Sequence, residues 1–274
     1  MVPACAQEKS DLSMRTPGAA AAELHPQSPS LSITPYNSTP RPPRVPSQFN
    51  SVRTSRRIIA LTFDDGPHPE LTPRLLDILR QQGIRATFFV VGRNVDAHPE
   101  IARRIVAEGH EIANHSWSHP DLTKLGEQAM RREVEDTSAA IERATGRRVT
   151  KMRPPYGAIN QRIREVLTKE HNLDVVLWSV DPLDWRKPGP SVVTQRLVDG
   201  ATPGGILLAH DIQAGTIEAM PETIAQLKAK GYGFATVSQL LAMREEARPP
   251  VVADAPAAAQ SGNAADQEAP AAAR

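Results

Sequence analysis

Residues 58–67 have the sequence IIALTFDDGP, the clearest indication of the fold in this chain. Residues 58–63 are a continuous run of apolar and β-branched side chains, which is typical of a buried strand in a parallel sheet. Asp64 and Asp65 follow this run, and Gly66-Pro67 then indicates a turn. We therefore expect two carboxylates at the end of a buried strand.

Strand and helix patterns alternate from this stretch to residue 246. Strands are expected at 58–63, 86–91, 112–113, 149–153, 175–180, 206–209 and 234–237. Helices are expected at 71–82, 99–108, 125–144, 161–170, 192–199, 217–230 and 238–246. This alternation predicts an α/β fold in which a parallel sheet, curved toward a barrel, has its helices outside. The polar clusters follow predicted strands, at the edge where such barrels build their sites.

The two ends of the chain differ in composition from its centre. Residues 1–54 are rich in Pro, Ser, Thr and Ala, and residues 247–274 are mostly Ala, Pro, Gln and Asp. Segments so poor in large apolar side chains bury too little surface to offset chain entropy. We expect a disordered leader or tether at 1–54 and a disordered tail at 247–274. Residues 55–246 are long enough to form one domain with a sizeable core.

The charge balance argues against a nucleic-acid partner, and the hydropathy argues against a transmembrane segment. The chain has 32 Lys and Arg against 31 Asp and Glu, without a long run of either sign. A nucleic-acid partner is therefore not expected. No apolar run is long enough for a transmembrane segment.

Cys5 is the only cysteine, so no intramolecular disulfide can form. The residues Val2-Pro3-Ala4-Cys5 resemble the end of a bacterial lipoprotein signal, in which the cysteine is acylated. The charged start and apolar run of such a signal are missing from this sequence. Two interpretations stay open: the true start lies upstream and Cys5 carries a lipid anchor, or Cys5 is incidental.

His115 and His119 are four residues apart, a spacing that places two side chains on one face of a helical turn. With one aspartate they supply the ligand types and number of a catalytic zinc site that keeps one position open. Cobalt and nickel fit the same ligands. Neighbouring residues of an extended backbone point to opposite sides, so Asp64 and Asp65 are expected to have different tasks. The ordinary alternative is a helix-capping aspartate beside a polar histidine pair.

Three further stretches carry polar groups. In RPPYG (153–157), the prolines stiffen a loop that could aim a backbone N–H at an oxyanion, and Arg153 could pair with an aspartate. The stretch DPLDW (181–185) by itself could be a turn with a buried tryptophan. The strand at 206–209 runs directly into His210, whose pKa would be raised by pairing with Asp184, as a general acid requires.

Five stretches in order, TFDDGP (62–67), HSWSH (115–119), RPPYG (153–157), DPLDW (181–185) and LAH (208–210), resemble the motifs of the polysaccharide deacetylases. These are carbohydrate esterase family 4 enzymes with a NodB-like domain, and the resemblance covers about residues 57–246. It implies a distorted (β/α) barrel with about seven parallel strands. It also implies removal of N-acetyl groups from N-acetylglucosamine units of chitin-like or peptidoglycan chains.

By this resemblance, Asp65, His115 and His119 would bind the divalent metal, most simply Zn²⁺. Asp64 would be the base, and Arg153 would orient it and keep it ionised.

The resemblance also assigns the remaining site residues. The backbone N–H of Tyr156 would complete the oxyanion site, and His210, held by Asp184, would be the acid. Leu208 and Trp185 would line a pocket for the acetyl methyl group.

The sequence thus predicts a metal-dependent hydrolase that acts on an acetylated glycan outside the cytoplasm. Two alternatives stay open: an O-acetyl esterase that acts on a polysaccharide, and a non-catalytic glycan-binding protein of the cell envelope.

Overall fold

The computed structural model describes residues 47–244. Their sheet has the strand order β1-β6-β5-β4-β3-β2-β7, and β8 pairs with β2. The strands are β1 (Gln48–Phe49), β2 (Ile58–Asp64), β3 (Thr87–Val90), β4 (Glu111–Asn114), β5 (Lys151–Met152), β6 (Asp174–Val176), β7 (Ile206–His210) and β8 (Gly233–Phe234). Neighbouring strands are parallel throughout. The prediction of a mostly parallel α/β sheet is confirmed.

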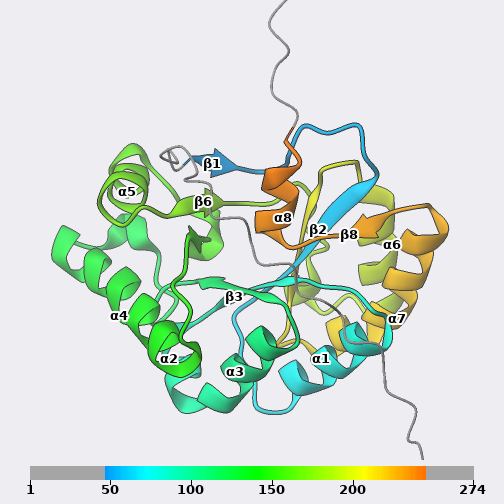
Figure 1. Ribbon diagram of the computed structural model, residues 1–274, viewed down its shortest axis with the longest axis horizontal. Helices are drawn as coiled ribbons and strands as arrows, with labels where there is room; N and C mark the ends of the chain where they lie inside the picture. The colour runs from blue at the N-terminus through cyan, green and yellow to red at the C-terminus, as the bar shows by residue number, and fades with distance from the viewer. Residues whose placement is uncertain (1–46, 245–274) are drawn as a thin grey trace, which may run out of the picture. The chain divides into compact units, whose positions relative to one another are not determined.

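Helices connect the strands, and most of them lie outside the sheet (Figure 1). They are α1 (Leu71–Gln81), α2 (Gly92–Ala97), α3 (Pro99–Ala107), α4 (Glu127–Thr145), α5 (Gln161–Glu165), α6 (Pro190–Gly200), α7 (Ala214–Ala229) and α8 (Val237–Ala242). A π-helical turn at Val166–Glu170 continues α5. The short helix α2 was not predicted. Among the described residues, no helix has the length and apolarity that a membrane crossing requires.

The two edges of the sheet meet through isolated bridges rather than through a continuous strand pair. Val180, just beyond β6, bridges Leu207 of β7, and Ser51 bridges Gly205. The sheet therefore curls into an incomplete barrel, as the distorted (β/α) barrel of the prediction requires.

The predicted leader at 1–54 overlaps this sheet, which corrects its boundary. Gln48 and Phe49 of β1 pair with Val175 and Val176 of β6, and Val52 is buried. Backbone pairing gives this short segment its structure, and two residues show no periodicity by which a sequence pattern could reveal a strand. Residues 1–46, with Cys5, and the tail predicted at 247–274 lie outside the described residues.

Side chains alternate along β2 between the two faces of the sheet. Leu61 and Phe63 belong to the apolar cluster that includes residues of the outer helices. Ala60 belongs to the inner cluster, and by the same alternation Thr62 and Asp64 also face the interior. The final residue of β2 therefore brings a carboxylate into the barrel.

Helix α8 covers the end of the barrel where the strands begin. Its Leu240 is part of the inner apolar cluster. The N–H of Val237 donates to Thr87 Oγ1 (2.9 Å), and the N–H of Ser238 donates to Glu111 Oε2 (2.9 Å). Thr87 and Glu111 are the first residues of β3 and β4. The carboxyl ends of the strands, at the opposite end, carry the polar residues described next.

Candidate active site

Four strand ends bring the predicted site residues together. Asp64 is the last residue of β2, and its Cα pairs with that of His210, the last residue of β7. His115 follows β4 directly, and Arg153 follows β5 directly. Because the strands are parallel, these ends lie at one edge of the sheet.

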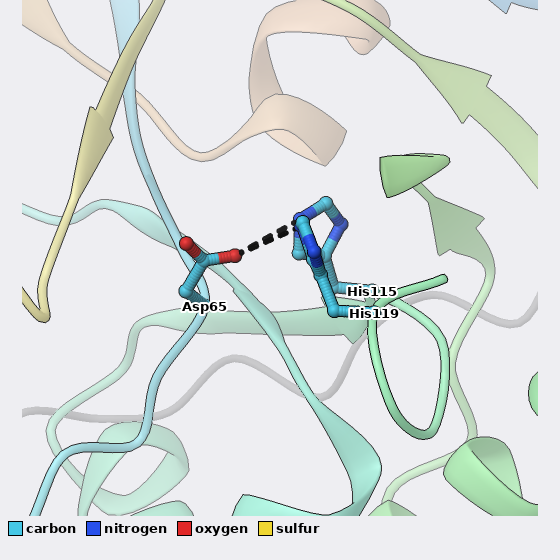
Figure 2. Close-up of side chains that lie close together, drawn as sticks. All are labelled: Asp65, His115 and His119. Carbon is cyan, nitrogen blue, oxygen red and sulfur yellow. Dashed lines mark ion pairs between the residues drawn. The ribbon is translucent and has the colours of Figure 1, made fainter. Parts of the chain in front are cut away.

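Asp65, His115 and His119 form a group that could hold a metal ion. Asp65 Oδ1 lies 3.4 Å from His115 Nε2 and 3.2 Å from His119 Nε2. Figure 2 shows both rings directed at this carboxylate. Ligand bonds of about 2.0–2.1 Å in a tetrahedral site give ligand separations of roughly 3.4 Å. Asp65 Oδ1 is buried without a hydrogen-bond partner in the described part of the chain, and a cation would satisfy it.

The protonation states of these ligands suit a metal. The Nδ1–H of His115 donates to the carbonyl oxygen of Arg153 (2.6 Å), which leaves the Nε2 lone pair free. Burial would raise the pKa of Asp65, but its close contact with His115 outweighs burial and lowers that pKa to about 2. Burial, together with the charge of His115, lowers the pKa of His119. A carboxylate and neutral imidazoles are the forms that bind metals.

The histidines lie on a loop outside the predicted helices, and not on the helical turn that their spacing would fit. Ser116 and His119 have positive φ angles of 66° and 62°. The Ser116 N–H donates to Asn114 Oδ1 (2.8 Å), and the His119 N–H donates to Ser116 Oγ (3.1 Å). Side-chain hydrogen bonds thus replace the helical pattern and still bring the rings within 4.9 Å of each other.

Asp65 also departs from extended backbone, with φ at 79°. The alternation expected for neighbouring residues therefore ends at Asp64. As a result both carboxylates approach one imidazole, because Asp64 Oδ2 lies 3.6 Å from His115 Nε2. Their different tasks stay a prediction.

Asp64 is held by a buried ion pair with Arg153. Arg153 is fully buried, and its Nη1 lies 2.6 Å from Asp64 Oδ1. The same nitrogen donates to Thr62 Oγ1 (2.9 Å), and the guanidinium carbon lies 4.1 Å above the Phe89 ring. Oδ1 of Asp64 is occupied, while Oδ2 faces the metal-ligand group.

Asp184 and His210 form a second pair. Asp184 Oδ1 lies 2.7 Å from His210 Nδ1, and Oδ2 accepts from the His210 backbone N–H (2.8 Å) and from Thr216 Oγ1 (2.6 Å). Burial would lower the pKa of His210, but the hydrogen bond and charge of Asp184 raise it to about 9. The imidazole is therefore protonated at neutral pH and can donate a proton.

The remaining predicted residues lie around these groups. Tyr156 is 69% exposed, and its ring lies edge-on to that of His119 at a centroid distance of 4.7 Å. Leu208 is buried on β7, two residues before His210. Trp185 is 49% exposed beside Asp184, with the Arg186 guanidinium 4.6 Å above its ring. The roles of Tyr156, Leu208 and Trp185 stay predictions.

Sequence reasoning overlooked Asp211, which directly follows His210. Its buried carboxylate accepts from Thr72 Oγ1 (2.5 Å) and lies against Gly66, where an added Cβ would be 2.1 Å from Asp211 Oδ2. Asp211 thus supports the turn after Asp65. The glycine in DDGP was the available signal, because it indicates a close approach.

The Asp184–His210 pair predicts a pH dependence. In metal-free protein, NMR titration of His210 should give a pKa well above 6.5, and Asp184→Asn should lower it. The imidazolium is stabilised in the folded state, so its contribution to stability is complete below about pH 6.5 and is lost as pH rises through about 9. An unchanged His210 titration in Asp184→Asn would contradict this.

Comparison with known proteins finds matching sequences. A family model described as polysaccharide deacetylase matches residues 51–176. The chain is 41% identical over 198 residues to the peptidoglycan-N-acetylglucosamine deacetylase PgdA of Listeria monocytogenes, covering 72% of this chain and 41% of PgdA. It is 40% identical over 197 residues to a chitooligosaccharide deacetylase of Rhizobium leguminosarum bv. trifolii, covering 71% of this chain and 87% of that protein. The chain thus spans less than half of PgdA.

Solved structures share the fold. A peptidoglycan N-acetylglucosamine deacetylase in complex with 4-naphthalen-1-yl-N-oxidanyl-benzamide gives a TM-score of 0.69 at 36% identity, covering 73% of this chain and 94% of that one. A CE4 family pseudoenzyme from Bacillus anthracis gives a TM-score of 0.69 at 30% identity, covering 73% and 71%. The fold therefore does not by itself establish activity. With its identity to the rhizobial relative along most of that protein's length, this chain belongs to the polysaccharide deacetylase family.

Proposed function

We propose that this chain is a metal-dependent hydrolase that removes N-acetyl groups from glycans containing N-acetylglucosamine. The observation that carries the proposal is Asp64, whose free oxygen faces the Asp65, His115 and His119 group while Arg153 occupies its other oxygen. The names of the relatives, peptidoglycan and chitooligosaccharide deacetylases, support this class of substrate.

Asp65, His115 and His119 are the proposed metal ligands, with Zn²⁺ as the preferred ion and Co²⁺ or Ni²⁺ as substitutes. A divalent ion bound there supplies a Lewis acid, which polarises a carbonyl oxygen and lowers the pKa of a water molecule. His115 Nδ1 is held by the Arg153 carbonyl oxygen and does not compete with Nε2 for the ion.

Asp64 acts as the base and accepts a proton from the attacking water at Oδ2. Arg153 fixes the carboxylate by binding Oδ1 (2.6 Å) and thereby aims Oδ2 at the reacting side. A base held in this way is already oriented before substrate binds.

His210 acts as the acid on the leaving nitrogen. An amine leaves poorly unless it is protonated, so amide cleavage needs a proton donor separate from the base. Asp184 holds His210 Nδ1 and stabilises the imidazolium. The Tyr156 backbone N–H is the proposed donor to the oxyanion, and Leu208 and Trp185 are proposed to line the pocket for the acetyl methyl group.

The proposed catalytic domain spans residues 55–246, together with residues 47–54 that join its sheet. We propose an extracytoplasmic location because peptidoglycan lies outside the cytoplasm. Acylation of Cys5 is a separate proposal, and a mass spectrum of the cell-derived amino terminus tests it: an unmodified Cys5 behind an intact Met1 would contradict it.

Asp64→Asn should reduce kcat for acetate release from chitooligosaccharides by roughly 10²–10⁴-fold, because the amide cannot take the proton. Zn²⁺ affinity, measured by competition with a chromophoric chelator, should change far less, since Asp64 is not one of the three ligands. Asp199→Asn, a change in an exposed ion pair with Lys230, is the control and should leave both values unchanged. Activity retained in Asp64→Asn would count against the proposed base.

His210→Ala separates the amidase from the O-acetyl esterase. Acetate release from chitooligosaccharide should fall far more than release from 4-nitrophenyl acetate, because a nitrophenolate leaves without protonation. The amidase rate of the wild type should fall at alkaline pH as His210 loses its proton, whereas the rate of His210→Ala should not show this fall. Equal losses on the amide and the ester would remove His210 from the acid role and favour the esterase.

A further inference from the structure

Helix α2 (Gly92–Ala97) contacts both chain segments that carry the metal-ligand group. It begins two residues after β3 and has no side-chain cap of its own. One of these segments is the turn at Asp65 and Gly66, and the other is the loop between His115 and His119.

The first residues of α2 hold the histidine loop. The N–H of Gly92 donates to the Ser116 carbonyl (3.0 Å), and the N–H of Arg93 donates to the Trp117 carbonyl (3.1 Å). The first N–H groups of a helix have no partner inside it, so these bonds satisfy them. The two carbonyls lie between the proposed ligands, and their position sets how the loop presents the two rings.

Gly92 allows this close approach. A Cβ at Gly92 would lie 2.5 Å from Trp117 Cε3 and 2.6 Å from Thr137 Oγ1. A side chain at position 92 would therefore displace either the loop or α4, which carries Thr137.

Asn94 of α2 and Val91, the residue before the helix, hold the aspartate segment. Asn94 Nδ2 donates to the Asp65 backbone carbonyl (2.8 Å), and the Val91 N–H donates to the Gly66 carbonyl (2.9 Å). Asp65 has φ at 79°, a region that side chains with a Cβ rarely adopt unless their surroundings hold them there. This conformation turns the Asp65 carboxylate toward both imidazoles.

We propose that Asn94 is a positioning residue for the metal site, which holds Asp65 in its left-handed conformation from the same short helix that fixes the histidine loop. The inference rests on the proposed function only in that the Asp65, His115 and His119 group binds a divalent ion. Asn94 itself donates to the backbone of one proposed ligand and is not a member of the Asp65, His115 and His119 group.

The test compares Asn94→Ala with a control, Asn160→Ala. The control also removes an asparagine amide, but from the residue before α5, where Asn160 Oδ1 accepts the N–H of Ile163. Metal-free samples of the full chain are titrated with Zn²⁺ against a chromophoric chelator and with Co²⁺ by visible absorption. Thermal unfolding without metal reports the general loss of stability.

Asn94→Ala should raise the Zn²⁺ dissociation constant about tenfold or more, in the range found when outer-shell partners of ligands are removed, and should change the Co²⁺ spectrum. Asn160→Ala should lower the unfolding temperature yet keep the wild-type affinity and spectrum. Should Asn94→Ala fail to fold, Asn94→Asp keeps the shape, loses the donor and should alter the Co²⁺ spectrum.

Wild-type affinity and an unchanged spectrum in the Asn94 variant would overturn the proposal, as would equal weakening in the Asn160 variant. Wild-type protein that binds Zn²⁺ but releases no acetate would contradict the proposed function and leave this inference intact.

Discussion

The site depends on the buried ion pair between the Arg153 guanidinium and Asp64. The guanidinium donates to Asp64 Oδ1, to Thr62 Oγ1 and to the carbonyls of Val176 and Leu177, so it joins β2 to β6 from the end of β5. An unpaired charge at this depth would be strongly unfavourable, and the fold therefore requires the ion pair with Asp64. The carbonyl oxygen of the same residue accepts the Nδ1–H of His115. One residue thus fixes both the proposed base and a proposed metal ligand.

Two imidazoles in this site are anchored through Nδ1, and the acceptor distinguishes their roles. His115 bonds to a neutral carbonyl oxygen, which fixes the tautomer and leaves Nε2 free to bind a cation. His210 bonds to the Asp184 carboxylate, which also stabilises the protonated ring and raises its pKa to about 9. The same side chain therefore serves as a ligand in one place and as a proton donor in the other.

The sequence predicted the sheet well because buried parallel strands are continuous apolar runs, as at 58–63, and because the polar clusters follow the ends of predicted strands. It could not reveal β1, whose two residues gain their structure from pairing with β6, or α2, which is too short to show a period. The spacing of His115 and His119 showed that their rings could meet, but it could not show that hydrogen bonds to Asn114 and Ser116 side chains shape the loop between them. The left-handed φ of Asp65 was also hidden, because that conformation depends on contacts from distant residues.

The most direct test of the account is acetate release from N-acetylated chitooligosaccharides and from peptidoglycan by protein stripped with a chelator, before and after Zn²⁺ is restored. We expect negligible release without metal, and after Zn²⁺ addition one free amine for each acetate released from at least one of the two glycans. Release that does not depend on metal, or Zn²⁺-loaded protein that yields no acetate from either glycan, would contradict it.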